Sequence, residues 1–176
     1  SCRRKFSEHH EGADLAAADP EVRRDFRRRC VIDYVTSIAD FCKENFPALE
    51  TMCCLMPRDR DLWQEAAQIK SLDNLGTDIY WVNGERDPEE MRPLVRDLSE
   101  ICGRYAKVHH EWLQCWNVRR GKEERIEMQG SILVDECPDA LYVWAWKGQV
   151  GTTETCDDPE EAWSRACKVL KMTHDS

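Results

Sequence analysis

The sequence lacks the short motifs that mark common catalytic and metal-binding sites. It contains no HExxH zinc motif and no GxSxG nucleophile elbow, and none of its eight glycines stands in a GxGxxG or GxxxxGK phosphate loop. No CxxC pair occurs, so the usual spacing of a thioredoxin-like redox site or a zinc ribbon is missing as well. We therefore expect no resident metal or cofactor, and no motif names a reaction.

Long apolar runs and an excess of positive charge are also absent. No stretch of about 18 apolar residues occurs, so the sequence predicts no membrane span. The chain holds 25 Lys and Arg against 34 Asp and Glu, for a net charge of -9. This acidic balance disfavours nucleic acid as the main partner.

Cysteine, in contrast, is plentiful: ten residues are spread along the whole chain. An even number distributed in this way is typical of a disulfide framework in an oxidising compartment. The alternative is a set of buried thiols in a cytosolic protein. Cys53 and Cys54 are adjacent, and ordinary disulfide geometry would direct them to different partners. We interpret the cysteines as cross-links and the chain as extracellular.

The longest apolar stripe lies in residues 87–116 and predicts a central helix over about 92–116. At about 100° per residue, one helical face collects the apolar side chains, which are Leu94, Leu98, Ile101, Cys102, Tyr105, Trp112 and Trp116. His109 lies close to this stripe and is interpreted as a hydrogen-bonded core residue, whereas His110 is expected to face solvent. Adjacent histidines on a helix point about 100° apart, so the pair does not predict a metal site.

A small β-hairpin is predicted after this helix, at about 131–147. The runs SILVDE and LYVWAW read as two antiparallel strands joined by a turn at Cys137 and Pro138. A helix starting at residue 124 is the alternative, and Gly130 and Pro138 disfavour it.

Residues 1–18 predict a flexible arm, and residues 19–176 a single disulfide-linked, mainly helical domain. Apolar side chains also recur at helical spacing in the stretches 20–45, 58–75 and 159–172. The predicted fold class is α+β and mainly helical, with four to five helices around the central helix, the hairpin beside it, and disulfides stabilising the whole.

Two groups of residues are candidates for binding. The aromatic group is Trp81, Tyr142, Trp144 and Trp146, of which the last three alternate along one strand face. This row either packs into the core, which we favour, or forms a surface for a protein or a flat apolar ligand. The basic group is Arg24, Arg27 and Arg28, which either form a solvated helix face or a docking patch for an acidic partner.

The predicted function is that of a secreted, disulfide-rich, non-enzymatic protein that binds another protein, as a receptor ligand, effector, toxin-like protein or inhibitor. One alternative is a carrier that holds a small hydrophobic ligand in a helical cavity. A second alternative is a zinc-dependent or acid/base enzyme, for which Asp135 and Glu136 supply adjacent carboxylates.

Overall fold

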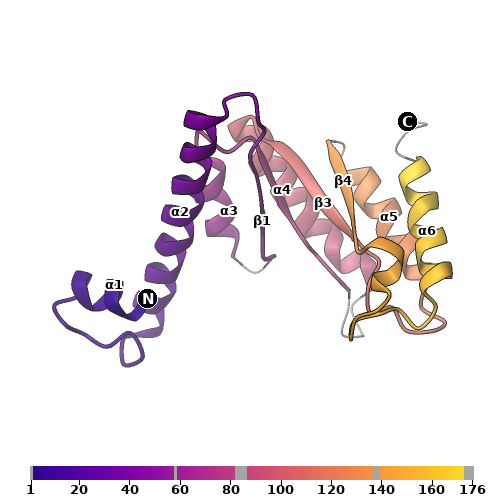
Figure 1. Cartoon of the computed structure of the whole chain (residues 1–176), viewed down its shortest axis with the longest axis horizontal. Helices are drawn as coiled ribbons and strands as arrows, with labels where there is room; N and C mark the ends of the chain where they lie inside the picture. Colours follow the sequence, from indigo (N-terminus) through magenta and orange to yellow (C-terminus); the bar gives the residue numbers. More distant parts are fainter. Residues whose placement is uncertain (1, 58, 82–86, 137–138, 173–176) are drawn as a thin grey trace.

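The computed structural model describes residues 2–57, 59–81, 87–136 and 139–172 (Figure 1). From β1 onward, strands alternate with helices. In chain order the elements are α1 Cys2–His9, α2 Pro20–Asn45, β1 Met52–Leu55, α3 Arg60–Ala67, β2 Asn74–Thr77, the 3-10 helix η1 Pro88–Met91, α4 Arg92–Tyr105, β3 Val108–Gln114, α5 Glu124–Glu136, β4 Ala140–Trp144, the 3-10 helix η2 Trp146–Gln149, and α6 Pro159–Met172.

The strands of the described residues form one four-stranded sheet in the order β1-β2-β3-β4, with every neighbouring pair parallel. In this register Gly76 lies beside His110, and Trp112 beside Tyr142. Because consecutive parallel strands need a crossover between them, each pair is joined by a connection that contains a helix. The carboxyl ends of all four strands consequently lie at the same edge of the sheet.

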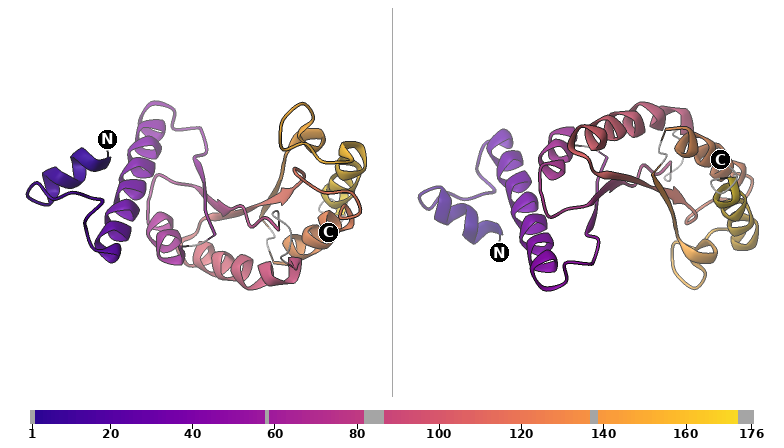
Figure 2. Two further views of the ribbon diagram at one scale, coloured as in Figure 1. Left: turned by 90° about the horizontal axis from the view of Figure 1, so that it is seen from below. Right: turned by 90° about the horizontal axis from the view of Figure 1, so that it is seen from above.

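Helices α3, α4 and α5 lie along one side of the sheet (Figure 2). Leu75 of β2 packs against Trp63 and Leu98 on this side, and Leu113 of β3 packs against Val95 and Leu133. These side chains are at most 1% exposed. We call this side the helix-covered face and the opposite side of the sheet the open face.

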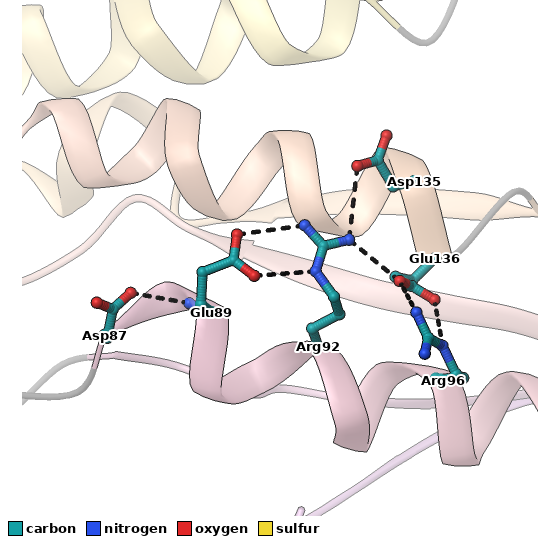
Figure 3. Close-up of polar contacts among 6 residues, drawn as sticks. All are labelled: Asp87, Glu89, Arg92, Arg96, Asp135 and Glu136. Atoms are coloured by element: carbon teal, nitrogen blue, oxygen red, sulfur yellow. Dashed lines mark hydrogen bonds and ion pairs between the residues drawn. The ribbon is translucent and has the colours of Figure 1, made fainter.

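Ion pairs join the outer surfaces of α4 and α5 (Figure 3). Arg92 and Arg96 on α4 both bind Glu136 at the end of α5, with closest N–O distances of 3.0 and 2.6 Å. Arg92 also pairs with Glu89 of η1 at 2.9 Å. Charged side chains thus connect the two helices outside the apolar layer.

The long helix α2 flanks the β1 side of the sheet (Figure 1). Asp19 caps its start by accepting a hydrogen bond from the Glu21 N–H, and Pro20 occupies the first turn. Ala39 packs into the cluster around Trp63. At the other end of α2, Phe26 packs edge-to-face on Phe6 of α1, which is 1% exposed.

The predicted central helix over 92–116 is wrong, because it joins two different elements. Helix α4 ends at Tyr105, where Ala106 adopts a left-handed conformation with φ 53 and donates its N–H to the Cys102 carbonyl. Strand β3 begins at Val108. Trp112 and Trp116 continue the helical stripe in sequence, but they also alternate with buried residues at the period of a strand. The periodicity therefore fits both structures.

The predicted antiparallel hairpin is also wrong. Residues 124–136 form α5, and β4 pairs with β3 in parallel. Gly130 is tolerated in α5 because it lies directly against the Val169 side chain of α6, at a close helix–helix approach. The predicted turn at residues 137 and 138 lies outside the described residues.

The predicted disulfide framework is wrong as well. Among the described cysteines, free thiols are Cys42, Cys53, Cys54, Cys102, Cys115, Cys156 and Cys167. Cys102, which is 1% exposed, contacts the Leu75 carbonyl at 3.7 Å and packs as a small apolar side chain. Packing between sheet and helices therefore stabilises the described fold. Among its helices, none is long and apolar enough to cross a membrane.

Candidate functional site

A cluster of aromatic rings lies on the open face of β3 and β4. Trp112 contacts Tyr142 with ring centroids 5.1 Å apart and Trp144 at 6.3 Å, and His110 contacts Tyr142 at 5.6 Å. Tyr142 is 37% exposed and Trp144 49% exposed. We call His110, Trp112, Tyr142 and Trp144 the aromatic patch. Tyr142 and Trp144 give the open face an apolar surface that solvent reaches, with His110 buried beneath them.

Strand alternation and register build this patch. His110 and Trp112 are two residues apart on β3, as are Tyr142 and Trp144 on β4, so each pair points to one face. The register places Trp112 next to Tyr142. Beside them on β2, Gly76 leaves room for His110, because a Cβ at position 76 would collide with the His110 carbonyl oxygen and imidazole ring.

A second group of side chains follows β2 and β3 at their carboxyl ends. Tyr80 packs edge-to-face on Trp116, with ring centroids 5.5 Å apart. Asp78 precedes Tyr80 by two residues, and burial raises the pKa of its carboxyl group. Burial also raises the pKa of the Tyr80 hydroxyl, and the Asp78 charge raises it further. At this end of the sheet, burial thus shifts a carboxyl group and a phenol toward their neutral forms.

Several polar atoms of the aromatic patch and of the segments that follow β2 and β3 are buried without a hydrogen-bond partner among the described residues. They are Asp78 Oδ1, both ring nitrogens of His110, Nε1 of Trp112 and of Trp116, and Asn117 Oδ1. Buried polar groups in folded proteins are nearly always satisfied. Trp63 Nε1 and Glu111 Oε2 on the helix-covered side also lack a partner in the described part of the chain, so the unpartnered atoms indicate a ligand site only together with the exposed rings of Tyr142 and Trp144.

His110 is 0% exposed, contrary to its predicted place in solvent. Burial lowers the pKa of its imidazole to about 4, so the ring is neutral at pH 7. A neutral imidazole has one N–H donor and one nitrogen acceptor. His110 therefore brings both kinds of hydrogen-bonding group to the open face.

Its neighbours His109 and Glu111 point the other way and form a separate buried pair. His109 Nε2 and Glu111 Oε1 lie 2.9 Å apart, and both side chains are at most 1% exposed. Burial lowers the pKa of His109 to about 4 and raises that of Glu111 well above its usual range, so both favour the uncharged form. The two residues share a strand face with Leu113 and belong to the helix-covered side.

The predicted aromatic candidates lie in three different environments. Trp81 is 4% exposed and belongs to the helix-covered core, where its Nε1 donates to Gln129 Oε1 at 3.1 Å. Tyr142 and Trp144 belong to the aromatic patch. Trp146 lies beyond the end of β4, is 68% exposed, and packs edge-to-face on Trp163 of α6.

The predicted basic candidates lie together on α2, away from the aromatic patch on β3 and β4 (Figure 1). Arg24, Arg27 and Arg28 line a groove of about 470 Å³ between α2 and α3. Arg28 binds Asp61 at 2.9 Å and Glu65 at 3.0 Å, and Arg24 lies 3.7 Å from Asp25. Ion pairs with acidic side chains thus compensate the charges of Arg28 and Arg24 in this groove.

Sequence reasoning missed Asp78, His110, Trp112 and Trp116 as site residues. Three of them lay inside the supposed central helix, where their strand alternation was assigned to a helical stripe. The available signal was the period of two from His110 through Trp112 and Gln114 to Trp116. Asp78 lies in the aromatic run DIYWV, and nothing in that run distinguishes it from other acids of an acidic chain.

The described residues contain no group of three or more His, Cys, Asp or Glu side chains placed to hold a metal ion. The site's polar atoms belong instead to an imidazole, two indoles, an amide and a carboxyl group.

Comparisons with solved structures identify the class of fold. No protein-family model and no curated protein matches the sequence. A solved structure of a protein assigned as an α-L-fucosidase from Bacteroides thetaiotaomicron matches with a TM-score of 0.59 and 9% identity, over 82% of this chain and 52% of the fucosidase chain. Two endo-1,4-β-mannanase structures from Thermotoga petrophila match with TM-scores of 0.52 and 0.51, each at 11% identity; they cover 84% and 85% of this chain and 40% and 53% of their own.

The shared fold is of the α/β class, with parallel strands and alternating helices as in (β/α) barrels. The chain spans about half the length of the solved structures it matches. The prediction of a disulfide-rich, non-enzymatic binding protein is therefore wrong. Cys42 and the cysteines named with it above are free thiols, and the solved structures that match the chain are those of glycoside hydrolases. The carrier alternative required a helical body, which this sheet-centred fold replaces.

Proposed function

We propose that the open face binds saccharides and that the chain belongs to a carbohydrate-active α/β protein of the glycoside hydrolase type. The observation that carries the proposal is the exposed aromatic patch beside unpartnered buried polar atoms, on the uncovered face of a parallel sheet. Enzymes built as (β/α) barrels bind their substrates at the carboxyl ends of the strands. Asp78 and Trp116 lie at that end.

A sugar ring matches this surface in both of its chemical characters. The C–H groups of one pyranose face are apolar and weakly positive, and they stack on the negative face of an aromatic ring. The hydroxyl groups around the ring rim both donate and accept hydrogen bonds. Trp112 Nε1 would donate to a hydroxyl oxygen, Asp78 Oδ1 would accept a hydroxyl proton, and His110 can do either. Because these atoms are buried, the rings around them would have to move aside for the hydroxyl groups to reach them.

Asp78 is the residue suited to acid catalysis at this face. Glycoside hydrolysis uses a carboxylic acid of raised pKa, which protonates the leaving oxygen, together with a second carboxylate. Burial raises the pKa of Asp78 in the direction that this acid role requires. The carboxyl group near Asp78 is that of Glu111, whose pKa burial and the Asp78 charge raise, and which lies on the helix-covered side and favours its uncharged form, so saccharide binding is the primary prediction and hydrolysis the secondary one.

The structural neighbours supply the first ligands to test. Their printed activities are those of an α-L-fucosidase and of endo-1,4-β-mannanases. Isothermal titration of the chain with 4-nitrophenyl α-L-fucoside and with β-1,4-mannotriose is expected to give saturable binding to at least one of them. Trp112→Ala is expected to weaken that binding at least tenfold, because it removes the ring at the centre of the patch.

Met128→Ala provides the matched control, since Met128 is an exposed apolar residue of α5 that lies outside the patch. This variant is expected to bind like the parent chain. If the bound sugar is hydrolysed, Asp78→Asn is expected to lower the rate by about 10²–10⁴ without matching the loss in affinity. Failure of the folded chain to bind either saccharide, or equal binding by Trp112→Ala and the parent, would refute the proposal.

A further inference from the structure

We infer that Trp146 forms a second stacking platform, so that the ligand of the open face is an oligosaccharide of at least two rings rather than a monosaccharide. The inference rests on the proposed saccharide-binding function and extends it to the class of ligand. Trp146 follows Trp144 of the aromatic patch by two residues and is the most exposed of the large apolar side chains described, at 68%.

The segment that carries Trp146 is held firmly to the rest of the fold. Gly148 adopts φ +62 and lies against Pro159, so a side chain at this position would collide with the start of α6. The Gly148 carbonyl accepts the Cys156 N–H at 2.9 Å, and the Val118 carbonyl accepts the Asp157 N–H at 2.9 Å. The turn after β4 is thereby attached to the segment after β3.

The Trp146 side chain is also fixed in its orientation. Its indole packs edge-to-face on Trp163 at 4.8 Å, with an interplanar angle of 62°. The ammonium group of Lys147 lies 5.5 Å from the Trp146 ring centroid. A large aromatic ring that is supported at its edge and still two-thirds exposed has little entropy left to lose when a ligand stacks on it.

Only Ala145 separates Trp144 of the patch from Trp146, so the two platforms are near enough along the chain for successive rings of one oligosaccharide. One sugar of an oligosaccharide would stack in the patch of Trp112, Tyr142 and Trp144, and a second would stack on Trp146. The Lys147 ammonium beside this ring can donate hydrogen bonds to hydroxyl oxygens of the outer sugar. A monosaccharide can occupy only one of the two platforms, so affinity is expected to increase with ligand length.

The test is a titration with mannose, β-1,4-mannobiose and β-1,4-mannotetraose, run on the parent chain and on Trp146→Ala. The parent is expected to bind the tetrasaccharide at least tenfold more tightly than the monosaccharide. Trp146→Ala is expected to remove most of that difference while leaving the affinity for mannose unchanged. Trp146→Phe is expected to recover part of it, because it restores an aromatic ring.

Val150→Ala is the control, because Val150 is 63% exposed in the same segment and carries no ring. It is expected to bind every ligand like the parent. Circular dichroism of each variant verifies folding. Equal affinity for short and long ligands, or a tetrasaccharide affinity that Trp146→Ala leaves intact, overturns the second platform while the proposed function stands. Absence of binding by all three sugars and by the fucoside overturns both.

Discussion

The two faces of the sheet differ in how far their aromatic rings are exposed and in how the polar groups beside those rings are bonded. On the helix-covered face, Trp63 and Trp81 are at most 4% exposed, and Gln129 of α5 satisfies four neighbouring polar groups. On the open face, Tyr142 and Trp144 are exposed and polar atoms of Asp78, His110 and Trp112 have no partner among the described residues. The helix-covered face therefore buries its rings and satisfies the polar groups around Gln129, although Trp63 Nε1 and Glu111 Oε2 lack a described partner there too, whereas the open face leaves two of its rings exposed to solvent.

This difference separates stability from function within one sheet. Burial of apolar side chains and satisfied hydrogen bonds on the helix-covered face supply most of the free energy of folding. Aromatic rings that remain in water contribute much less, since a large part of their surface is not removed from solvent. Substitutions on the helix-covered face should consequently change the free energy of unfolding, whereas substitutions on the open face should change saccharide affinity.

The largest expected loss of stability comes from Gln129→Leu. The Gln129 amide accepts from the Trp81 Nε1 and the Gln114 N–H at 3.1 and 3.0 Å, and donates to the Trp112 and Ile79 carbonyls at 3.2 and 3.3 Å. A leucine of similar size would leave these buried groups without a partner, at a cost of about 3–5 kcal/mol in all. Urea unfolding followed by circular dichroism measures the change.

Gln64→Leu is the matched control, because Gln64 is exposed on α3. A change at an exposed site is expected to stay within about 0.5 kcal/mol. If Gln129→Leu is as stable as the control, the helix-covered face does not depend on its satisfied polar network, and the contrast between the two faces fails on that side.

The sequence allowed the helices to be predicted better than the sheet. Helix α2 spans Pro20–Asn45 and α6 spans Pro159–Met172, as the apolar spacing and the Asp-Pro starts indicate. Helical side-chain spacing and end signals are local, so they can be read from adjacent residues. Parallel pairing joins strands that are more than twenty residues apart, and no local pattern records which strand lies next to which.

Only part of the candidate site could be predicted from the sequence, for the same reason. Tyr142 and Trp144 stand out because they alternate in a short aromatic run. Trp112 and His110 lie on β3, which is separated from the end of α4 by only two residues, with neither Gly nor Pro to mark the boundary. Ala106 makes the left-handed turn that usually takes glycine. The end of α4 therefore left no signal, and two residues of the patch were assigned to the wrong element.

A smaller effect is expected from Gly130→Ala. A Cβ at this position would collide with the Val169 side chain, so α5 and α6 would have to move apart, at a cost of about 1–3 kcal/mol. Gly103→Ala is the control on α4, where an added Cβ meets nothing within 4 Å. That variant is expected to gain up to about 1 kcal/mol from better helix propensity. Similar gains for both variants in thermal unfolding would show that α5 and α6 are not in close contact.

The smallest expected effect belongs to the ion pairs outside the apolar layer (Figure 3). Arg96 and Arg92 hold the pKa of Glu136 at about 2, below its ordinary value of 4.5. A carboxyl group whose pKa is lowered by folding stabilises the folded state above pH 4.5 and loses that contribution as the pH falls toward 2. Glu136→Gln should therefore cost no more than about 1 kcal/mol of unfolding free energy at pH 7. In urea unfolding, its difference from the parent should shrink as the pH is lowered through this window.

Glu90→Gln is the control, at an exposed position of η1 with no ion pair among the described residues. Its difference from the parent should not change with pH in this way. If the loss of unfolding free energy in Glu136→Gln persists unchanged at pH 2, the Glu136 side chain stabilises the fold through packing rather than through charge.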